Sequence, residues 1–288
     1  MTQKGLVALL GAAVLFVTVA APFADAQTPA KKDPENANRT LVWIPKTVNS
    51  TFWLAVWEGT KKAATELGYK EVLYKGTAAQ SDIAGQVNLV NDMVSRKVSG
   101  IMIAATDAKA LVDPVEKAVA AGVPVVTLDS GVDSQKPYAY IATDNIAAAK
   151  TAADVLGGLI GSKGTVGDIG ITAGSQTGRE REDGFVKQRN MKGKIKSVSF
   201  DVSPDQFLLF LDGYLDALIV QDPFQMGYRG VYAMDQVIHK QPVKDKLVAI
   251  PAKVVTLKNI SQPDIYDLLA SYGDIKSILE EKKIKRGP

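Results

Sequence analysis

The sequence has 288 residues, of which 46% are hydrophobic and 23% are charged, and its formal net charge is +3. This composition is typical of a globular protein and excludes a collagen-like, coiled-coil or disordered chain. The charge is too small to indicate a nucleic-acid partner. Cysteine is absent and His239 is the one histidine. Disulfides, thiol nucleophiles and cysteine-ligated metal sites are therefore excluded, and no metal or cofactor is expected.

Residues 1–26 have the pattern of a secretory signal peptide. The apolar run ends at Pro22 and is shorter than the ~20 residues of a membrane-spanning helix. Ala24 and Ala26 form a small-x-small cleavage pattern, so we expect cleavage after Ala26 and export to the periplasm. Residues 27–39 are polar and contain proline, and they are expected to be an unstructured linker.

From residue 41 the sequence alternates between short apolar runs and helical periodicity. Apolar runs predict buried strands, and apolar residues at every third or fourth position predict helices with one buried face. The predicted strands are 41–44, 71–74, 100–104, 123–128, 138–142, 165–171, 197–200, 217–220 and 252–257. The predicted helices are 52–67, 83–94, 110–121, 146–160, one from about 178, 205–211 and 224–238, the last capped by His239.

Strands that are apolar throughout and separated by helices are typical of a parallel sheet covered on both faces. Right-handed crossovers then give a doubly wound α/β fold. Two such series in one chain predict two lobes with a cleft between them. In doubly wound sheets ligands bind beyond the carboxyl ends of the strands, so the residues after each strand are the candidates for a site.

The residues at these strand ends follow one another in a recognisable order. They are the polar and doubly aromatic loop 47–53, Asp129-Ser130, Thr143-Asp144-Asn145, the charged stretch 179–185, Phe200-Asp201 and Gln221-Asp222-Pro223. In order and spacing they resemble the ribose-type (type I) periplasmic sugar-binding proteins of ABC importers. The resemblance extends over about residues 41–269, which is nearly the whole of the expected mature chain.

The resemblance implies a two-lobed periplasmic-binding-protein-like α/β fold of doubly wound, mostly parallel sheets, with a ligand cleft and a hinge between the lobes. Lobe 1 would comprise residues 40–143 and 222–248, and lobe 2 residues 144–221 and 249–288. The implied function is capture of a monosaccharide or related polyol and its delivery to the permease of an ABC transporter. A chemoreceptor is left open as a further partner. A protein of this kind is not an enzyme.

Sugars present C–H faces that pack on aromatic rings, and hydroxyls that bind carboxylates, amides and guanidinium groups. By position, the resemblance implies sugar contacts from Ser50, Phe52, Trp53, Asp129, Asp144, Arg181, Asp201 and Gln221. Ser50 stands where close relatives carry asparagine, and Ser130 stands where ribose binders carry arginine. Both departures argue against ribose itself as the ligand.

Structural alternatives are open at several of these positions. Phe52 or Trp53 could belong to the core, since both begin an amphipathic helix. Asp129 could cap a helix. Arg181 could lie on a solvated helix start.

The second lobe is shorter than the family pattern requires. After Phe185 the family continues through further strands and helices, whereas this chain reaches the strand of Phe200-Asp201 after residues 186–199. About one and a half to two βαβ units of ~30 residues each are therefore missing. This loss should expose apolar faces of the neighbouring helices, so we expect lobe 2 to be poorly stable or to pair its remaining strands in a new order.

Three rivals to the transport function are considered. One is a family member that has lost ligand binding through its incomplete second lobe. Another is a sugar-sensing protein of the chemoreceptor or regulator type, against which the signal peptide and the lack of a helix-turn-helix segment argue. The third is an exported hydrolase using Glu180 and Asp183, for which nothing defines the geometry that two catalytic carboxylates need.

Overall fold

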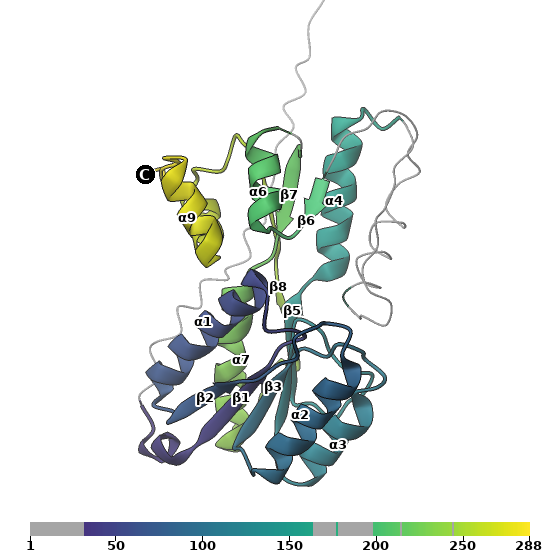
Figure 1. Cartoon of the computed structure of the whole chain (residues 1–288), viewed down its shortest axis with the longest axis vertical. Coiled ribbons are helices and arrows are strands. Elements are labelled where there is room, and N and C mark those ends of the chain that lie inside the picture. The colour runs from purple at the N-terminus through teal and green to yellow at the C-terminus, as the bar shows by residue number, and fades with distance from the viewer. Residues whose placement is uncertain (1–31, 164–176, 178–197, 214, 244) are drawn as a thin grey trace, which may run out of the picture. The chain divides into compact units, whose positions relative to one another are not determined.

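The computed structural model describes residues 32–163, 177, 198–213, 215–243 and 245–288. Several sequence predictions lie outside the described residues, namely the signal peptide at 1–26, the strand at 165–171, the helix from about 178, and Arg181. Within the described residues two sheets carry the fold (Figure 1).

The first sheet has six strands, all joined by parallel ladders. In spatial order they are β2 (Glu71–Tyr74), β1 (Thr40–Ile44), β3 (Gly100–Ile103), β4 (Val125–Leu128), β5 (Ala139–Thr143) and β8 (Leu247–Ile250). Every residue of β3 and β4 is buried. This burial confirms the interpretation of the apolar runs as central strands of a covered parallel sheet.

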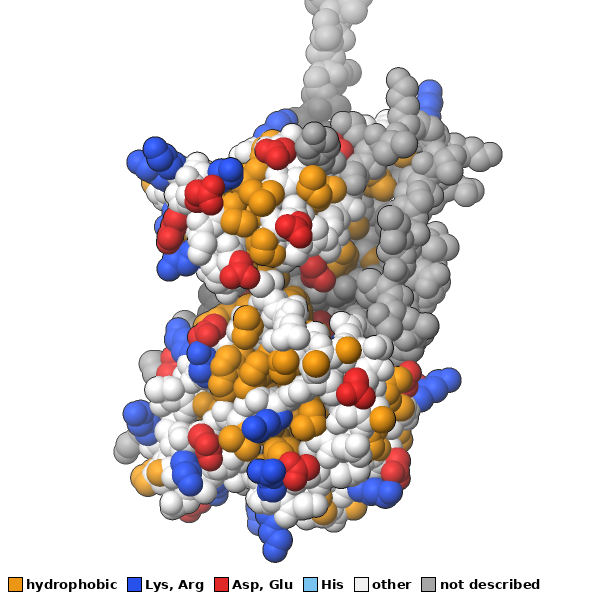
Figure 2. Space-filling model, viewed as in Figure 1, with side chains coloured by type: hydrophobic (Ala, Val, Ile, Leu, Met, Phe, Trp, Pro, Cys, Tyr) orange, Lys and Arg blue, Asp and Glu red, His pale blue; other side chains and the backbone are white. Residues whose placement is uncertain are grey.

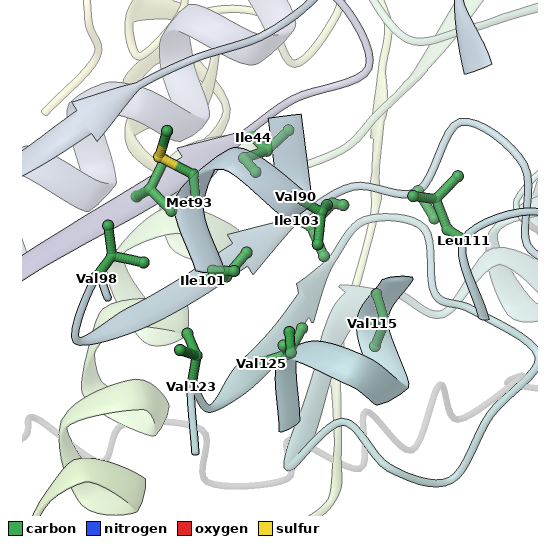
Figure 3. Packing of buried hydrophobic residues seen from close by; sticks show 13 residues of the cluster. Ile44, Val90, Met93, Val98, Ile101, Ile103, Leu111, Val115, Val123 and Val125 are labelled. Atoms are coloured by element: carbon green, nitrogen blue, oxygen red, sulfur yellow. The ribbon is translucent and has the colours of Figure 1, made fainter. Parts of the chain in front are cut away.

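Helices cover both faces of this sheet. They are α1 (Thr51–Leu67), α2 (Ile83–Ser95), α3 (Val112–Ala120) and α7 (Pro223–Ile238). Figure 1 shows α2 and α3 on one face and α1 with α7 on the other. Alternate residues of a strand point to the same side, so Ile101 and Ile103 of β3 both meet the α2–α3 side, where they pack with Val90 and Val115 (Figure 3).

The backbones of α1 and α7 touch where the two helices cross. A Cβ atom at Gly227 would lie 1.9 Å from the carbonyl oxygen of Val56, and one at Gly59 would lie 2.0 Å from that of Phe224. Real side chains cannot come so close, so the crossing requires a glycine on each helix. These two helices form a rigid pair behind the sheet.

The second sheet contains β6 (Val198–Phe200), β7 (Ala217–Val220) and β9 (Lys253–Val255). The β6–β7 ladder is parallel and the β7–β9 ladder is antiparallel. Its helices are α4 (Asn145–Leu159), α6 (Pro204–Leu211), α8 (Pro263–Ala270) and α9 (Gly273–Glu281). The chain passes between the two sheets three times: after β5, after β7, and between β8 and β9.

A separate hydrophobic core covers the second sheet, and α8 and α9 supply a large part of it. Buried members from these helices are Ile265, Leu268, Leu269, Ile275 and Leu279. The C-terminal helices thus cover one face of this sheet. Large apolar side chains are still exposed on its other helices, at Ile146 and Leu159 of α4 and at Leu208 and Leu209 of α6.

Three parts of the structure differ from the sequence prediction. Strand β8 was not predicted, although its sequence LVAI is an apolar run; it lies at the sheet edge, where its first residue, Leu247, is 59% exposed. Helices α8 and α9 were not predicted, although the charged residues 280–283 have the composition of a solvated helix end. The expectation of an unstructured linker is wrong for Pro34–Asn38, which form a 3₁₀ helix. The reason is tertiary, since the buried Asn36 donates a hydrogen bond to the Leu67 carbonyl over 3.1 Å.

Candidate functional site

The candidate residues within the described chain follow the ends of strands, as the sequence predicts. Ser50 lies between β1 and α1, and Asp129, Asp144, Asp201 and Gln221 each come directly after a strand. Asp129 and Asp201 have left-handed backbone conformations, with φ values of 60° and 69°. Non-glycine residues rarely adopt this region, and aspartate is among those that do so most readily; Lys97, Ser162, Lys240 and Lys283 adopt it as well.

Asp201 and Gln221 come together at the end of the second sheet. The Gln221 Nε2 group donates a hydrogen bond to Asp201 Oδ1. The β6–β7 ladder explains the contact, since it pairs Phe200 with Ile219 and so brings the two strand ends to one edge. The pair presents a carboxylate and an amide side by side, which is the arrangement that adjacent hydroxyls of a sugar can bind.

Gln221 also has a buried side-chain hydrogen-bond acceptor that forms no hydrogen bond within the described structure. Its side chain is almost completely buried, and its Oε1 atom has no hydrogen-bond partner among the described residues. The hydroxyls of Thr106, after β3, and of Thr143, at the end of β5, are in the same state. A buried polar atom without a partner costs about 1–3 kcal/mol. The described residues hold two further atoms of this kind, Trp43 Nε1 and the Tyr74 hydroxyl, but those on Thr106, Thr143 and Gln221 lie beside the predicted sugar contacts and are places that a hydroxyl-bearing ligand could complete.

Asp129 is at the centre of a buried polar group. The Lys46 ammonium lies 3.8 Å from its Oδ2, and the Ser130 hydroxyl donates to the same oxygen over 2.9 Å. The Tyr140 hydroxyl donates to the Asp129 backbone carbonyl, also over 2.9 Å. Because the carboxylate is held from several directions, it is positioned to accept from a further donor. Asp129 does not begin a helix, so the capping alternative does not apply to it.

The two aromatic candidates occupy different surroundings. Trp53 is 5% exposed, and its ring centroid lies 6.0 Å from that of Trp43 in the core. Phe52 is only partly buried; it meets Trp53 edge to face at 4.8 Å and packs against the core of the second sheet. Of the two, Phe52 therefore has the larger surface for contact with a ligand.

Two further candidates lie at helix N-termini. Asp144 is exposed, and its carboxylate accepts from the Ala147 amide over 3.0 Å, which caps α4. Ser50 is the N-cap residue of α1, but its side chain makes no capping hydrogen bond within the described structure. Their sugar contacts stay predictions, as do those of the other six candidates.

Lys46, Thr106 and Thr143 follow predicted strands, and this position marks them as residues to examine for a site. None of them was among the predicted sugar contacts. Their chemistry was not visible, because burial of a lysine beside an aspartate, or of a hydroxyl without a partner, depends on contacts with distant residues.

Asp222 begins α7 at the passage that follows β7, and its carboxylate accepts from the Gln225 amide over 3.0 Å. Burial raises the pKa of this carboxyl above its ordinary value of 3.8, and the Gln225 amide and the charges of Lys253 and Arg229 oppose the rise. The native state thus holds the proton more tightly than the unfolded chain does. The contribution of Asp222 to the free energy of unfolding must therefore fall as the pH rises from about 3.8 through the pKa of this carboxyl in the native state.

Asp222→Asn is accordingly expected to raise the free energy of unfolding at pH 7, with little gain below pH 4. Asparagine keeps an oxygen that can cap α7 but carries no charge. Urea unfolding from pH 3 to pH 7 measures the effect. Asp82→Asn is the matched control, because Asp82 caps α2 in the same way at an exposed position. A parallel shift of the two variants would contradict the role given to burial at Asp222.

A group of possible metal ligands lies away from the strand ends. Oxygen or nitrogen atoms of Asp33, Glu35 and His239 lie within 4.8 Å of one another. The Arg39 guanidinium already occupies this group, 2.8 Å from both Glu35 Oε2 and His239 Nε2. A second cation is not favoured there. As the sequence predicts, His239 is the C-cap residue of α7.

On the face seen in Figure 2, lysine and arginine side chains are interspersed with aspartate and glutamate, and no large area carries a single sign of charge. This mixture agrees with the small net charge.

Among the described helices, none combines the length and the apolar character needed to cross a membrane.

Comparison with known proteins gives a consistent result. A model of the family described as periplasmic binding protein domain matches residues 41–188. The ribose import binding protein of Escherichia coli is 26% identical over 300 residues, covering 85% of this chain and 96% of the relative. Since 85% of 288 residues is about 245, about 55 of the 300 aligned positions have no counterpart in this chain. This shortfall agrees with the predicted internal loss.

Two solved structures are similar over most of the chain. One is an ABC transporter solute-binding protein from Agrobacterium vitis with bound D-fucose, with a TM-score of 0.74 and 28% identity, covering 79% of this chain and 99% of the other. The second is a carbohydrate transporter solute-binding protein from Agrobacterium radiobacter in complex with D-arabinose, with a TM-score of 0.73 and 26% identity, covering 80% and 98%. The fold, the order of the strand-end residues and these similarities lead to one conclusion: the chain belongs to the periplasmic binding protein family, and within it to the ribose type.

Proposed function

We propose that this protein is an extracytoplasmic solute-binding protein that captures a monosaccharide or related polyol and delivers it to the permease of an ABC transporter. The family is one of transport proteins and not of enzymes. Support for a sugar comes from the relatives, which are named for ribose import or contain bound D-fucose or D-arabinose. The periplasm is the compartment of the family, and we propose that the signal peptide is cleaved after Ala26. A chemoreceptor is a second proposed partner.

The observation that carries the proposal is the buried, unpartnered Oε1 atom of Gln221 beside the Asp201 carboxylate. A sugar hydroxyl donates as well as accepts, so a single hydroxyl could donate to the Gln221 oxygen while its neighbour donates to Asp201. Asp129 is the proposed acceptor on the first sheet, and Phe52 offers the apolar contact. The other proposed contacts are Ser50, Trp53, Asp144 and Arg181.

We propose that the sugar binds between two lobes, lobe 1 of residues 40–143 and 222–248 and lobe 2 of residues 144–221 and 249–288. Gln221 lies at one of the three passages between the two sheets. A side chain at such a passage can contact the ligand, and its position changes when the lobes rotate about the passages. Closure by such a hinge is the general mode of domain movement around a ligand, and the ligand favours the closed state by its differential affinity.

Thermal unfolding of the purified protein with a panel of pentoses, hexoses and polyols tests the function. The panel includes D-ribose, D-fucose and D-arabinose. A sugar at one hundred times its dissociation constant should stabilise the native state by ~2.7 kcal/mol. For a chain of this size that corresponds to a rise in Tm of about 5–10 °C. The rise should depend on the sugar concentration.

One second function has a specific observation in its favour. The roughly 55 aligned positions that this chain lacks support a family member that folds but no longer binds a sugar. A cooperative melt that no sugar in the panel shifts would favour that alternative. A dose-dependent shift with one sugar would exclude it and would identify the ligand class at the same time.

A further inference from the structure

The C-terminal helices reach the passage that carries Gln221. Tyr272, which precedes α9 as its N-cap residue, is completely buried. Its hydroxyl donates a hydrogen bond to the backbone carbonyl of Gln221 over 3.1 Å. Gln221 lies one residue beyond the last pair of the β7–β9 ladder, Val220 with Lys253. The hydroxyl therefore holds a carbonyl that lies past the end of the sheet.

The same helices support the aromatic candidate from behind. Phe52 packs against the cluster that contains Tyr272, Ile275 and Leu279, and α9 contacts α1, the helix that Phe52 begins. One buried cluster thus touches the side chain of one proposed ligand residue and the backbone of another.

The C-terminal segment is itself firmly attached. The Lys253 ammonium of β9 lies 2.6 Å from the Asp264 carboxylate at the start of α8. After α9 the chain turns back, and Arg286 forms a two-bond ion pair with Asp267 over 2.7 and 2.9 Å. These ion pairs are exposed and add modestly to the buried apolar side chains, which are the main contacts that hold Tyr272 in place. A hydroxyl on a fixed support can define the position of the carbonyl it binds.

We propose that Tyr272, which lies between α8 and α9, is a positioning residue that sets the orientation of Gln221 toward the sugar through its hydroxyl. This inference rests on the proposed function. The hydroxyl fixes the peptide group of Gln221, and the peptide group limits where the amide can lie. Without that hydrogen bond, the amide would sample positions that cannot bind Asp201 and the sugar together.

Tyr272→Phe tests the proposal because it removes the hydroxyl and keeps the ring. We expect its dissociation constant for the sugar identified in the thermal panel to rise about tenfold, the effect of one hydrogen bond. Hydrogen exchange in the peptide that spans residues 219–226, measured without sugar, should be faster than in the wild type. Calorimetric titration well below Tm gives the affinity of the folded protein.

Two control variants separate positioning from stability. Ser271→Ala removes a neighbouring hydroxyl, that of the C-cap residue of α8, which within the described structure donates to the Leu268 carbonyl over 2.6 Å. Ile275→Val trims the same core without touching the Gln221 carbonyl. Both are expected to bind sugar within twofold of the wild type, with unchanged exchange at 219–226, even if Tm falls.

The outcomes distinguish this inference from the function on which it rests. If the wild type binds a sugar and Tyr272→Phe binds it equally well with unchanged exchange, the inference is overturned and the function stands. If Tyr272→Phe and Ile275→Val weaken binding alike, Tyr272 acts through stability alone and the inference is again overturned. If the wild type binds no sugar but exchange rises only in Tyr272→Phe, the function fails while the hydroxyl still positions the passage. Unchanged exchange together with no binding would refute both.

Discussion

Replacing Gln221 by leucine is expected to weaken sugar binding about 100-fold while leaving the free energy of unfolding within about 1 kcal/mol of the wild type. The variant loses the amide that would bind the sugar and the hydrogen bond to Asp201. It also removes the buried Oε1 atom that has no partner in the described structure, which offsets part of the loss. Calorimetric titration and urea unfolding of the same preparation measure the two quantities.

Gln86 offers a matched control, since it is also a fully buried glutamine. Its amide nitrogen donates to the carbonyls of Pro45 and Ala104, over 3.2 and 2.8 Å, and its oxygen accepts from the Thr106 amide over 2.8 Å. Gln86→Leu leaves three buried backbone groups unpaired and should cost at least about 3 kcal/mol of stability. If Gln221→Leu were equally destabilising, or bound sugar as the wild type does, Gln221 would be a structural residue and not a ligand.

Replacing Gly227 by alanine is expected to lower the free energy of unfolding by about 3 kcal/mol or more, at the upper end of overpacking effects. The new methyl group would lie 1.9 Å from the Val56 carbonyl oxygen, and because that atom belongs to a helix backbone it cannot move aside alone. Helices α1 and α7 would have to separate, which would also disturb their packing on the first sheet. Tm should fall by about 6–12 °C for a chain of this size.

The control is Gly158→Ala on α4, where an added Cβ would have no atom of the described residues within 4 Å. There the alanine should be neutral or should stabilise by up to about 1 kcal/mol, through its helix propensity. Thermal unfolding of both variants makes the comparison. Equal effects at the two sites would show that helix propensity matters and that the close approach of α1 and α7 does not.

Much of the fold could be predicted because it depends on local pattern. In the first sheet, the apolar runs that became β3 and β4 and the periodic stretches that became α1 and α2 are determined by residues within one turn or one pleat of each other. Strand β8 has the same kind of apolar run, LVAI, and was missed because four apolar residues that follow a short polar stretch do not by themselves show a pairing with β5, about a hundred residues earlier in the sequence. Helices α8 and α9 are short, and their burial depends on a sheet made from residues far away in the sequence.

The candidate site, too, could be predicted only in part. The positions of Asp129, Asp201 and Gln221 after strands could be predicted, because ligand sites in doubly wound sheets lie at the carboxyl ends of strands. The sequence could not show which of their polar atoms already form hydrogen bonds with the protein. The pairing of Gln221 with Asp201 depends on the register of β6 with β7, and its missing partner at Oε1 depends on everything that packs around it.

By itself, the sequence determined the α/β class, the ribose-type resemblance and the shortened second lobe, because periodicity, order and spacing are properties of the chain alone. Only the tertiary structure decided how that lobe closes its core and what supports the passage at Gln221. Tyr272 is 51 residues from Gln221 in the sequence, and no local pattern links them. The hydrogen bond exists because the C-terminal helices fold back over a sheet that would otherwise expose its apolar face, which makes burial of that face the physical reason for the contact.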